Sequence, residues 1–290
     1  MEKIIPKRIM ILGSTGMLGH MLFFYLKKNK KFKIYNLSFR KKLNSKSIIC
    51  DIHNISDLKK ILKRIKPEII INSIGILPQN PKFNKINSIF INSLFPQRLK
   101  EISKELNSKI IQISTDCVFD GKRGKYSEND IPNEIKTYGL TKILGEITGT
   151  QHLTIRTSII GPELKKEGKG LLHWVFNENG KIKGYNKAIW GGITTLELSK
   201  VIEYCISYNI SGLYHVTNGE SISKYDLLNL IKREFKLNQI EIIKDSSIIY
   251  DRSLISERSD IKYKFSSYDK MISELNLFYS INKDLYSYRF

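Results

Sequence analysis

Cysteine is scarce in this chain of 290 residues, which has only three, spaced too widely for a metal site or a disulfide framework. Long apolar runs are missing too, and none approaches the roughly 20 residues that a membrane-spanning helix needs. No apolar stretch of signal-peptide length follows the charged N-terminus. We therefore expect a protein of the reducing cytoplasm with no membrane partner.

The composition that remains is that of an ordinary globular protein, with 41% hydrophobic and 26% charged residues. Lys and Arg number 48 against 28 Asp and Glu, a net charge of +20. Such a charge attracts polyanions, but the basic residues are spread over every segment instead of forming one stripe. This favours a compositional origin of the charge, so we expect no nucleic-acid partner.

Short apolar runs alternate with amphipathic stretches through the first half of the chain. Strands are predicted at 8–12, 32–37, 47–50, 68–74, 109–114 and 153–159. Helices are predicted between them, including one capped by Ser56 and one over 89–106 that is kinked or restarts at Pro96. This order indicates an α/β fold, a Rossmann-type doubly wound parallel sheet. We expect a dinucleotide-binding domain over 1–160, to which strand 212–216 returns, and a smaller, mostly substrate-binding lobe over 161–290, with a helix capped by Ser223.

A glycine-rich loop follows the first predicted strand and opens the first helix. It reads Gly13-Ser14-Thr15-Gly16-Met17-Leu18-Gly19. Glycine permits the tight turn and a close approach of the backbone to phosphates, and the helix N-terminus offers amides and partial positive charge. The order of strand, loop and helix predicts a dinucleotide site, with these candidate binding residues: Gly13, Thr15, Gly16, Met17, Leu18 and Gly19.

The end of the second strand predicts which nicotinamide cofactor binds. An acid there would accept from the ribose 2′-hydroxyl of NAD, but the chain has Arg40 and Lys41 and no acid. Cations at this point favour the 2′-phosphate of NADPH, with NADH as the alternative. After the third strand, Asp51 is placed to accept from the adenine amino group, and Ile52 is a further candidate contact.

Three residues are the candidate catalytic centre. Thr115 ends the fifth strand, and Tyr138 and Lys142 follow at a spacing of four, which puts them on one helical face. An ammonium beside a phenol lowers the phenol's pKa, so Tyr138 could donate a proton to a ketone oxygen as hydride arrives at its carbon. The Thr115 hydroxyl could orient that oxygen.

With these motifs the sequence resembles the extended short-chain dehydrogenase/reductase superfamily, and within it the dTDP-4-dehydrorhamnose reductase family. The resemblance rests on the glycine loop, on Ser114–Gly121 and on Tyr138–Glu146, with looser matches at 153–158 and 212–216. It implies Thr115, Tyr138 and Lys142 as the catalytic trio, with Lys142 also holding the nicotinamide ribose. It implies an Asn near the active site at Asn92. It further implies NADPH-dependent reduction of a nucleotide-activated 4-keto-6-deoxyhexose for surface polysaccharide synthesis.

Departures from the family pattern bear on the details. Met21 stands where some members carry a Glu that helps a metal-bridged dimer, so we expect no such metal, although a homodimer remains compatible. Cys117 replaces a common Tyr, and the pair Asp116-Cys117 argues against a dehydratase. The GDP-fucose synthase branch has a similar Cys, paired with a His for epimerisation, and His173 lies at roughly the corresponding distance here.

Two alternative functions therefore stay open. One is a bifunctional epimerase-reductase that uses Cys117 and His173 as base and acid. The other is a non-catalytic regulatory subunit like the beta subunit of methionine adenosyltransferase, which shares the fold. For the nucleotide-sugar substrate the candidate contacts are Arg156 to a diphosphate and Trp174 to a base or sugar, although a place in the core or on the solvated surface is the favoured explanation of each.

Overall fold

A seven-stranded sheet is the centre of the first of two units in the computed structural model, which describes residues 5–288. The strand order is β11-β6-β5-β4-β1-β2-β3, and the pairs from β6 to β3 run parallel. Their bounds are β1 (Lys7–Leu12), β2 (Phe32–Ser38), β3 (Ile48–Ile49), β4 (Ile69–Asn72), β5 (Lys109–Ile113), β6 (Leu153–Arg156) and β11 (Gly212–His215). The order reverses beside β1, and ligands of such sheets bind where the strand order reverses, at the carboxyl ends.

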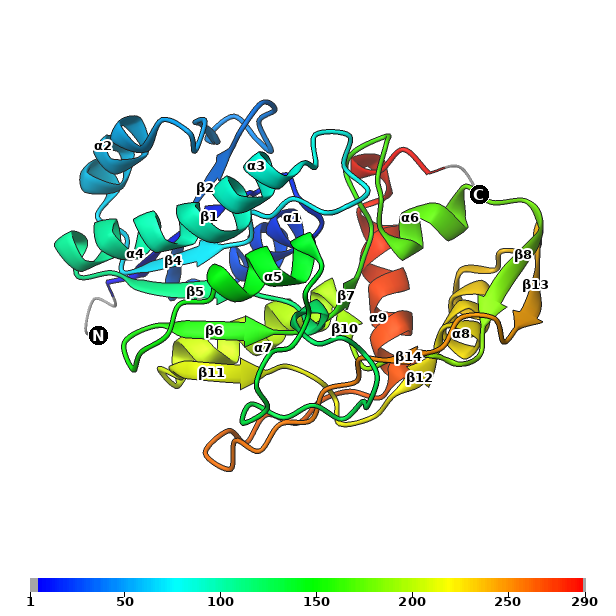
Figure 1. The fold of residues 1–290 in the computed structure, drawn as a ribbon. Helices are drawn as coiled ribbons and strands as arrows, with labels where there is room; N and C mark the ends of the chain where they lie inside the picture. Colours follow the sequence, from blue (N-terminus) through cyan, green and yellow to red (C-terminus); the bar gives the residue numbers. More distant parts are fainter. Residues whose placement is uncertain (1–4, 289–290) are drawn as a thin grey trace. The chain divides into compact units, whose positions relative to one another are not determined.

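Helices cover both faces of this sheet, as the doubly wound prediction requires. In Figure 1, α4 and α5 lie in front of the strands and α1 lies behind them. The bounds are α1 (Met17–Leu26), α2 (Ile55–Ile65), α3 (Lys85–Ser88), the π-helix η1 (Ile89–Leu94), α4 (Phe95–Leu106), α5 (Thr137–Leu144) and α7 (Thr195–Ser207). Leu58 and Leu62 of α2 and Phe95 and Leu99 of α4 are fully buried in one apolar core with the strands.

Local sequence signals account for most helix ends. The kink or restart predicted at Pro96 corresponds to a change from π-helix to α-helix at Phe95, with no gap between the two. Ser223 caps the later helix as predicted, accepting from the Asp226 amide at 3.0 Å. The predicted cap Ser56 is wrong, because Asn54 accepts from the Asp57 amide at 3.1 Å and the helix begins one residue before Ser56.

The second unit comprises residues 116–134, 156–201 and 215–288. It holds small sheets and helices: η2 (Asp116–Val118), β7 (Ile159–Ile160), α6 (Leu171–Phe176), β8 (Gly180–Tyr185), β9 (Ala188–Trp190), β10 (Ile193–Thr194), β12 (Ile222–Ser223), α8 (Lys224–Phe235), β13 (Ile240–Asp245), β14 (Tyr250–Asp251), α9 (Tyr268–Ile281) and η3 (Lys283–Leu285).

The units are interleaved in the chain, not only at β11, whose return to the first sheet was expected, but also at residues 116–134. Residues 116–134 leave the sheet after β5 and join the second unit. The reason is pairing with a segment more than 100 residues away: the Tyr126 amide donates to the Ser253 carbonyl at 3.0 Å, and the Ile255 amide donates to the Tyr126 carbonyl at 2.9 Å.

Candidate active site

The glycine loop after β1 is packed so tightly that two of its glycines have no room for a side chain. Gly13 has a positive φ of 83°, and a Cβ there would lie 3.0 Å from the Ile74 side chain. A Cβ on Gly19 would lie 2.1 Å from the Gly13 carbonyl oxygen, so only glycine lets α1 start this close to the strand end. The loop has the close backbone packing that a pyrophosphate cradle requires.

The N-terminus of α1 has no side-chain cap. Gly16 stands at the N-cap position, and no side chain of residues 5–288 caps the first amides of the helix. These amides and the helix dipole would suit an anionic phosphate. The residues present therefore fit a dinucleotide.

His20, which the sequence reasoning missed, supports this loop from inside the helix. The ring is fully buried, and Nδ1 lies 2.8 Å from the Gly16 carbonyl oxygen. Burial lowers the pKa of His20 to about 4, against a smaller opposing effect of that hydrogen bond, so the ring is neutral at pH 7. Because a carbonyl oxygen only accepts, Nδ1 carries the hydrogen and donates to Gly16.

The residues expected near the adenosine end lie at the ends of β2 and β3. Arg40 is exposed, with its guanidinium 4.7 Å from the centre of the Phe39 ring. Asp51 Oδ1 accepts from the His53 amide at 3.0 Å and lies 2.8 Å from His53 Nδ1. Burial alone would raise the pKa of Asp51, but these hydrogen bonds and the charges of His53 and Arg40 lower it below its usual value.

The predicted trio lies entirely in the first unit. Thr115 follows β5 and is buried, and Tyr138 and Lys142 lie one turn apart on α5. Lys142 Nζ donates to the Ile113 carbonyl at 2.7 Å, which ties α5 to the strand end that leads to Thr115. Burial lowers the pKa of Lys142 to about 8, and the charge of Glu146 partly opposes this. The structure thus brings Lys142 to the end of the strand that carries Thr115.

Asn92 holds the neighbouring turn after β4. Its Oδ1 accepts from the Ile76 amide at 3.0 Å and its Nδ2 donates to the Ile76 carbonyl at 3.2 Å and to Thr141 at 3.3 Å. A Cβ on Gly75 would lie 3.6 Å from Asn92 Oδ1 and 4.0 Å from Lys142 Nζ. Asn92 and Lys142 therefore converge on Gly75, and Asn92 sits in a π-helix, a feature frequent at functional sites.

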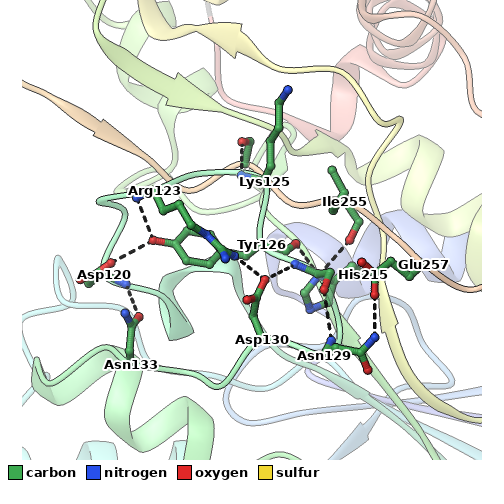
Figure 2. A network of polar contacts seen from close by, with 12 residues as sticks. Asp120, Arg123, Lys125, Tyr126, Asn129, Asp130, Asn133, His215, Ile255 and Glu257 are labelled. Atoms are coloured by element: carbon green, nitrogen blue, oxygen red, sulfur yellow. Dashed lines mark hydrogen bonds and ion pairs between the residues drawn. The ribbon is translucent and has the colours of Figure 1, made fainter.

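The segment between Thr115 and Tyr138 is held by a polar network of the second unit, shown in Figure 2. The Tyr126 hydroxyl donates to Asp120 at 2.9 Å and accepts from the Arg123 amide at 3.1 Å. Arg123 pairs with Asp130, whose carboxylate also accepts from the Ser127 amide at 2.7 Å. Gly121, Gly124 and Lys125 all have positive φ. The backbone of this segment therefore adopts a defined conformation with tight turns.

Arg156 is buried in the second unit, and its contacts there are structural. Its Nη1 lies 3.3 Å from His215 Nε2, and the guanidinium lies 5.4 Å from the centre of the Phe119 ring. His215 Nδ1 faces the carbonyls of Tyr126 and Ile255 at 3.0 and 3.2 Å, so Nδ1 donates and Nε2 accepts from Arg156. A role of Arg156 in binding a diphosphate stays a prediction.

Cys117, His173 and Trp174 also belong to the second unit. Cys117 Sγ lies 3.7 Å from Arg252 Nη1, while His173 Nδ1 lies 3.0 Å from the Tyr288 hydroxyl. Trp174 is 37% exposed on the short helix α6. Cys117 and His173 are thus held by different neighbours, and their pairing for epimerisation stays a prediction. Arg252 was not singled out from the sequence, since nothing local distinguishes it from the other cations.

Among residues 5–288, no group of three or more His, Cys, Asp and Glu side chains is arranged to hold a metal ion. Met21, whose position prompted the expectation of no bridging metal, is fully buried in the core. Within the same range, no helix combines the length and apolarity that crossing a membrane requires.

A Rossmann-type sheet, a glycine loop after its first strand and a Tyr-x-x-x-Lys helix beside its fifth strand define an extended short-chain dehydrogenase/reductase. Within that superfamily the chain belongs to the RmlD substrate binding domain family, whose model matches residues 7–249. The resemblance noted in the sequence is thereby confirmed at the level of family and fold.

Relatives of two kinds resemble the chain in sequence. A dTDP-4-dehydrorhamnose reductase of Aggregatibacter actinomycetemcomitans is 28% identical over 234 residues, 76% of each chain. The methionine adenosyltransferase 2 subunit beta of Xenopus tropicalis is 21% identical over 252 residues, 80% of this chain and 73% of that one.

Among solved structures, the dTDP-4-dehydrorhamnose reductase of Bacillus anthracis in complex with NADP has a TM-score of 0.79 at 23% identity, covering 94% of this chain and 99% of that one. A hypothetical dTDP-4-dehydrorhamnose reductase of Sulfolobus tokodaii has a TM-score of 0.77 at 27% identity, covering 90% of this chain and 98% of that one. These likenesses establish the fold and leave the activity of this chain to be argued from its residues.

Proposed function

We propose that the protein is an NADPH-dependent reductase of a nucleotide-activated 4-keto-6-deoxyhexose. The observation that carries this proposal is the intact trio in one unit, with Lys142 fixed by its hydrogen bond to Ile113 at the end of the strand that leads to Thr115. The family relation to dTDP-4-dehydrorhamnose reductases supports the substrate class.

In this proposal Thr115 and Tyr138 act directly on the ketone oxygen of the substrate, and Lys142 acts on the phenol of Tyr138. Tyr138 donates the proton, since its spacing of four from Lys142 puts the two residues on one face of α5, and an ammonium close to a phenol favours loss of the phenol's proton. The Thr115 hydroxyl donates to the same oxygen and orients it. A nicotinamide cofactor, when bound, supplies the hydride. The loop from Gly13 to Gly19 and the first amides of α1 would hold the cofactor's pyrophosphate, and Arg40 and Lys41 its 2′-phosphate.

The direct test is oxidation of NADPH by the purified protein against a panel of 4-keto-6-deoxyhexoses linked to dTDP, UDP and GDP. Loss of absorbance at the NADPH wavelength with one of these sugars, and isolation of the corresponding 6-deoxyhexose, is the expected result. Absence of turnover with every member of the panel, in a protein that still binds NADPH, would refute the proposal.

A second function is favoured by the relatives named methionine adenosyltransferase 2 subunit beta. If the protein is a regulatory subunit of that type, it should bind a methionine adenosyltransferase and change its kinetics without oxidising NADPH. Co-purification with that enzyme, measured beside the sugar panel, separates the two functions. The presence of Thr115, Tyr138 and Lys142 leads us to prefer the reductase.

A third function, epimerisation coupled to reduction, would need Cys117 and His173 to act as base and acid. Incubation of the protein with a 4-keto substrate in deuterated water, without NADPH, would then place deuterium on the carbons beside the ketone. We expect no incorporation above the buffer control. Deuterium that enters with the unmodified protein and not with Cys117→Ser would move the function to an epimerase-reductase.

A further inference from the structure

His53 makes two side-chain contacts at the adenosine end of the candidate cofactor site, and the proposed mechanism does not use it. Its Nδ1 lies 2.8 Å from Oδ1 of Asp51. Its ring also stacks on Phe90, with the ring centres 4.2 Å apart and the planes 8° apart. All three residues belong to the first unit. The imidazole is thus held at its edge by a carboxylate and on its face by an aromatic ring.

Backbone hydrogen bonds connect Asp51 to the glycine loop through the end of β2. The Gly13 amide donates to the Leu37 carbonyl at 2.9 Å, and the Cys50 amide donates to the Ser38 carbonyl at 3.0 Å. Neighbouring strands lie about 4.8 Å apart, and β2 separates β1 from β3, so the ends of β1 and β3 are roughly 10 Å apart. A dinucleotide whose pyrophosphate lies on the glycine loop can therefore extend its adenosine half toward Asp51.

The two oxygens of the Asp51 carboxylate differ in their contacts. Oδ1 accepts from the His53 amide at 3.0 Å and also from Nδ1 of the same residue, which must carry a hydrogen because a carboxylate only accepts. Oδ2 accepts no hydrogen bond from any of residues 5–288, and the Asp51 side chain is 44% exposed. Oδ2 is therefore the oxygen that a donor from a ligand can reach.

The His53 ring determines how firmly that oxygen is oriented. The terminal torsion of an aspartate is broad, so the single bond to the His53 amide leaves the plane of the carboxylate loosely set. The ring adds a second bond to the same oxygen. The ring is itself fixed by its stack on Phe90, which packs against the apolar core of the sheet. Phe90 and His53 thus transmit the rigidity of the core to the Asp51 carboxylate.

An oriented carboxylate oxygen selects the chemistry of the group that meets it. It attracts an N–H donor, and it repels an oxygen that can only accept. The 6-amino group of adenine is such a donor. Hypoxanthine, a purine of nearly the same size, has an oxygen at that position. Contact with Oδ2 would therefore distinguish the two bases.

From these contacts we infer that His53 is a positioning residue for adenine recognition: it holds the Asp51 carboxylate so that Oδ2 accepts from the 6-amino group of the cofactor's adenine. The inference rests on the proposed function for the identity of that cofactor as NADPH. Sequence reasoning selected Asp51 and missed His53. Their spacing of two could have indicated it, because an aspartate often accepts from the backbone two residues further on.

Titration with two cofactors that differ only at position 6 of the purine tests this role. NADPH carries the amino group, and deamino-NADPH carries an oxygen in its place. The unmodified protein should bind NADPH ~10-fold more tightly, the scale of a hydrogen bond to a charged group. His53→Phe keeps an aromatic ring on Phe90 but removes the donor nitrogen. It should reduce that ratio by ~3-fold or more through weaker binding of NADPH alone.

Two further variants show whether His53 acts through Asp51. In Asp51→Asn the preference for NADPH should already be small, and adding His53→Phe should not reduce it further, because the carboxylate that the ring positions is absent. Ser56→Ala, at an exposed position three residues after His53, is the matched control and should change neither affinity. A merely structural role of His53 would weaken both cofactors alike in either background.

Three results would overturn the inference. They are equal affinities of the unmodified protein for NADPH and deamino-NADPH, equal weakening of both cofactors by His53→Phe, and an unchanged ratio in that variant. Failure of NADPH to bind would also refute it. The reductase proposal fails on a different observation, the absence of turnover in a protein that still binds NADPH, so the two can fail separately.

Discussion

At the scale of single residues, the candidate centre depends on how burial changes the chemistry of two side chains. Lys142 is almost fully buried, its ammonium donates to the carbonyl of Ile113, and the residue lies one turn after Tyr138 on α5. The phenol is half-buried, so a substrate could reach it, while the ammonium that we propose to activate it is buried. This division of exposure suits a proton donor and its activating charge.

Tyr138→Phe should lower turnover by ~10²-fold or more, because removing the proton donor removes general acid catalysis. The dissociation constant of NADPH should change little. Steady-state NADPH oxidation and fluorescence titration of NADPH measure the two effects, with Tyr208→Phe, at an exposed tyrosine, as the control. Near-normal reduction by Tyr138→Phe would remove this residue from the mechanism.

Arg40 and Lys41 should make NADPH bind more tightly than NADH. Neutralising both residues should narrow that difference by ~1–3 kcal/mol, the range for charge-assisted hydrogen bonds to the 2′-phosphate. Titration of both cofactors into the unmodified protein and the double variant measures it. The idea fails if NADH already binds as well as NADPH to the unmodified protein.

The pKa of Lys142, lowered by burial to about 8, predicts a pH-dependent stability. Between about pH 8 and the ordinary lysine value near 10.4, the unfolded state holds a proton that the folded state has lost, so the free energy of unfolding rises with pH. Below pH 8 both states are charged, and burial of the ammonium costs about 3 kcal/mol in full.

Urea denaturation at pH 7 and pH 10 measures this effect. The free energy of unfolding of the unmodified protein should rise relative to that of Lys142→Met across this range. The control is Lys270→Met, at an exposed position on α9. Its free energy of unfolding should change with pH as that of the unmodified protein does. If the free energy of unfolding of Lys142→Met changes with pH as that of the unmodified protein does, the Lys142 ammonium is not desolvated in the folded state.

At the scale of elements, the junctions between strands and helices position the candidate site. The start of α1 abuts the turn at Gly13, and the end of α5 abuts η1, where a Cβ on Gly145 would lie 1.7 Å from the Asn92 carbonyl oxygen. Both contacts require glycine, so the third glycine of the loop and the glycine three residues after Lys142 have packing roles. These contacts hold the two helices of the site close to the strand ends.

Gly19→Ala tests the first junction. The added methyl would lie 2.1 Å from the Gly13 carbonyl oxygen, so α1 must shift away from β1. We expect a loss of ~1–3 kcal/mol in the free energy of unfolding, the usual cost of overpacking, and NADPH binding weakened by more than the effect of Gly16→Ala. At Gly16 the same methyl would meet the oxygen at 3.2 Å, a milder contact. Equal NADPH affinities of Gly19→Ala and Gly16→Ala would contradict the proposed pyrophosphate site in this loop.

At the scale of the whole molecule, the net charge of +20 is the feature that a single site does not explain. Cations lie in both units, among them exposed Lys and Arg side chains on α2, α4, α8 and α9. A charge spread in this way raises solubility and attracts polyanions without a shaped interface.

Retention on DNA is therefore expected only at low ionic strength. The protein should bind a DNA column in dilute buffer and elute near physiological salt, about 0.15 M, without preference between duplex sequences, because counterion release alone drives the binding. Elution by a salt gradient and competition between two unrelated duplexes measure this. Sequence-selective retention at higher salt would point to a nucleic-acid site.

The sequence by itself determined the fold class and the candidate trio, because both are encoded locally. Apolar runs of strand length define the sheet, the glycine spacing defines the loop, and a spacing of four places Tyr138 and Lys142 on one helical face. The dinucleotide loop was predicted for the same reason, since its strand, turn and helix are contiguous in the chain.

Only the tertiary structure decided what depends on contacts between distant segments. It joined residues 116–134 to the second unit through pairing of Tyr126 with Leu254, and it gave Arg156 a buried place beside His215. It also brought Arg252 to Cys117 and Glu134, across more than 100 residues of chain. Contacts of this kind cannot be predicted from hydrophobic periodicity, because that pattern reports only the local secondary structure of each segment. Which distant segments come into contact is decided by the packing of the whole chain.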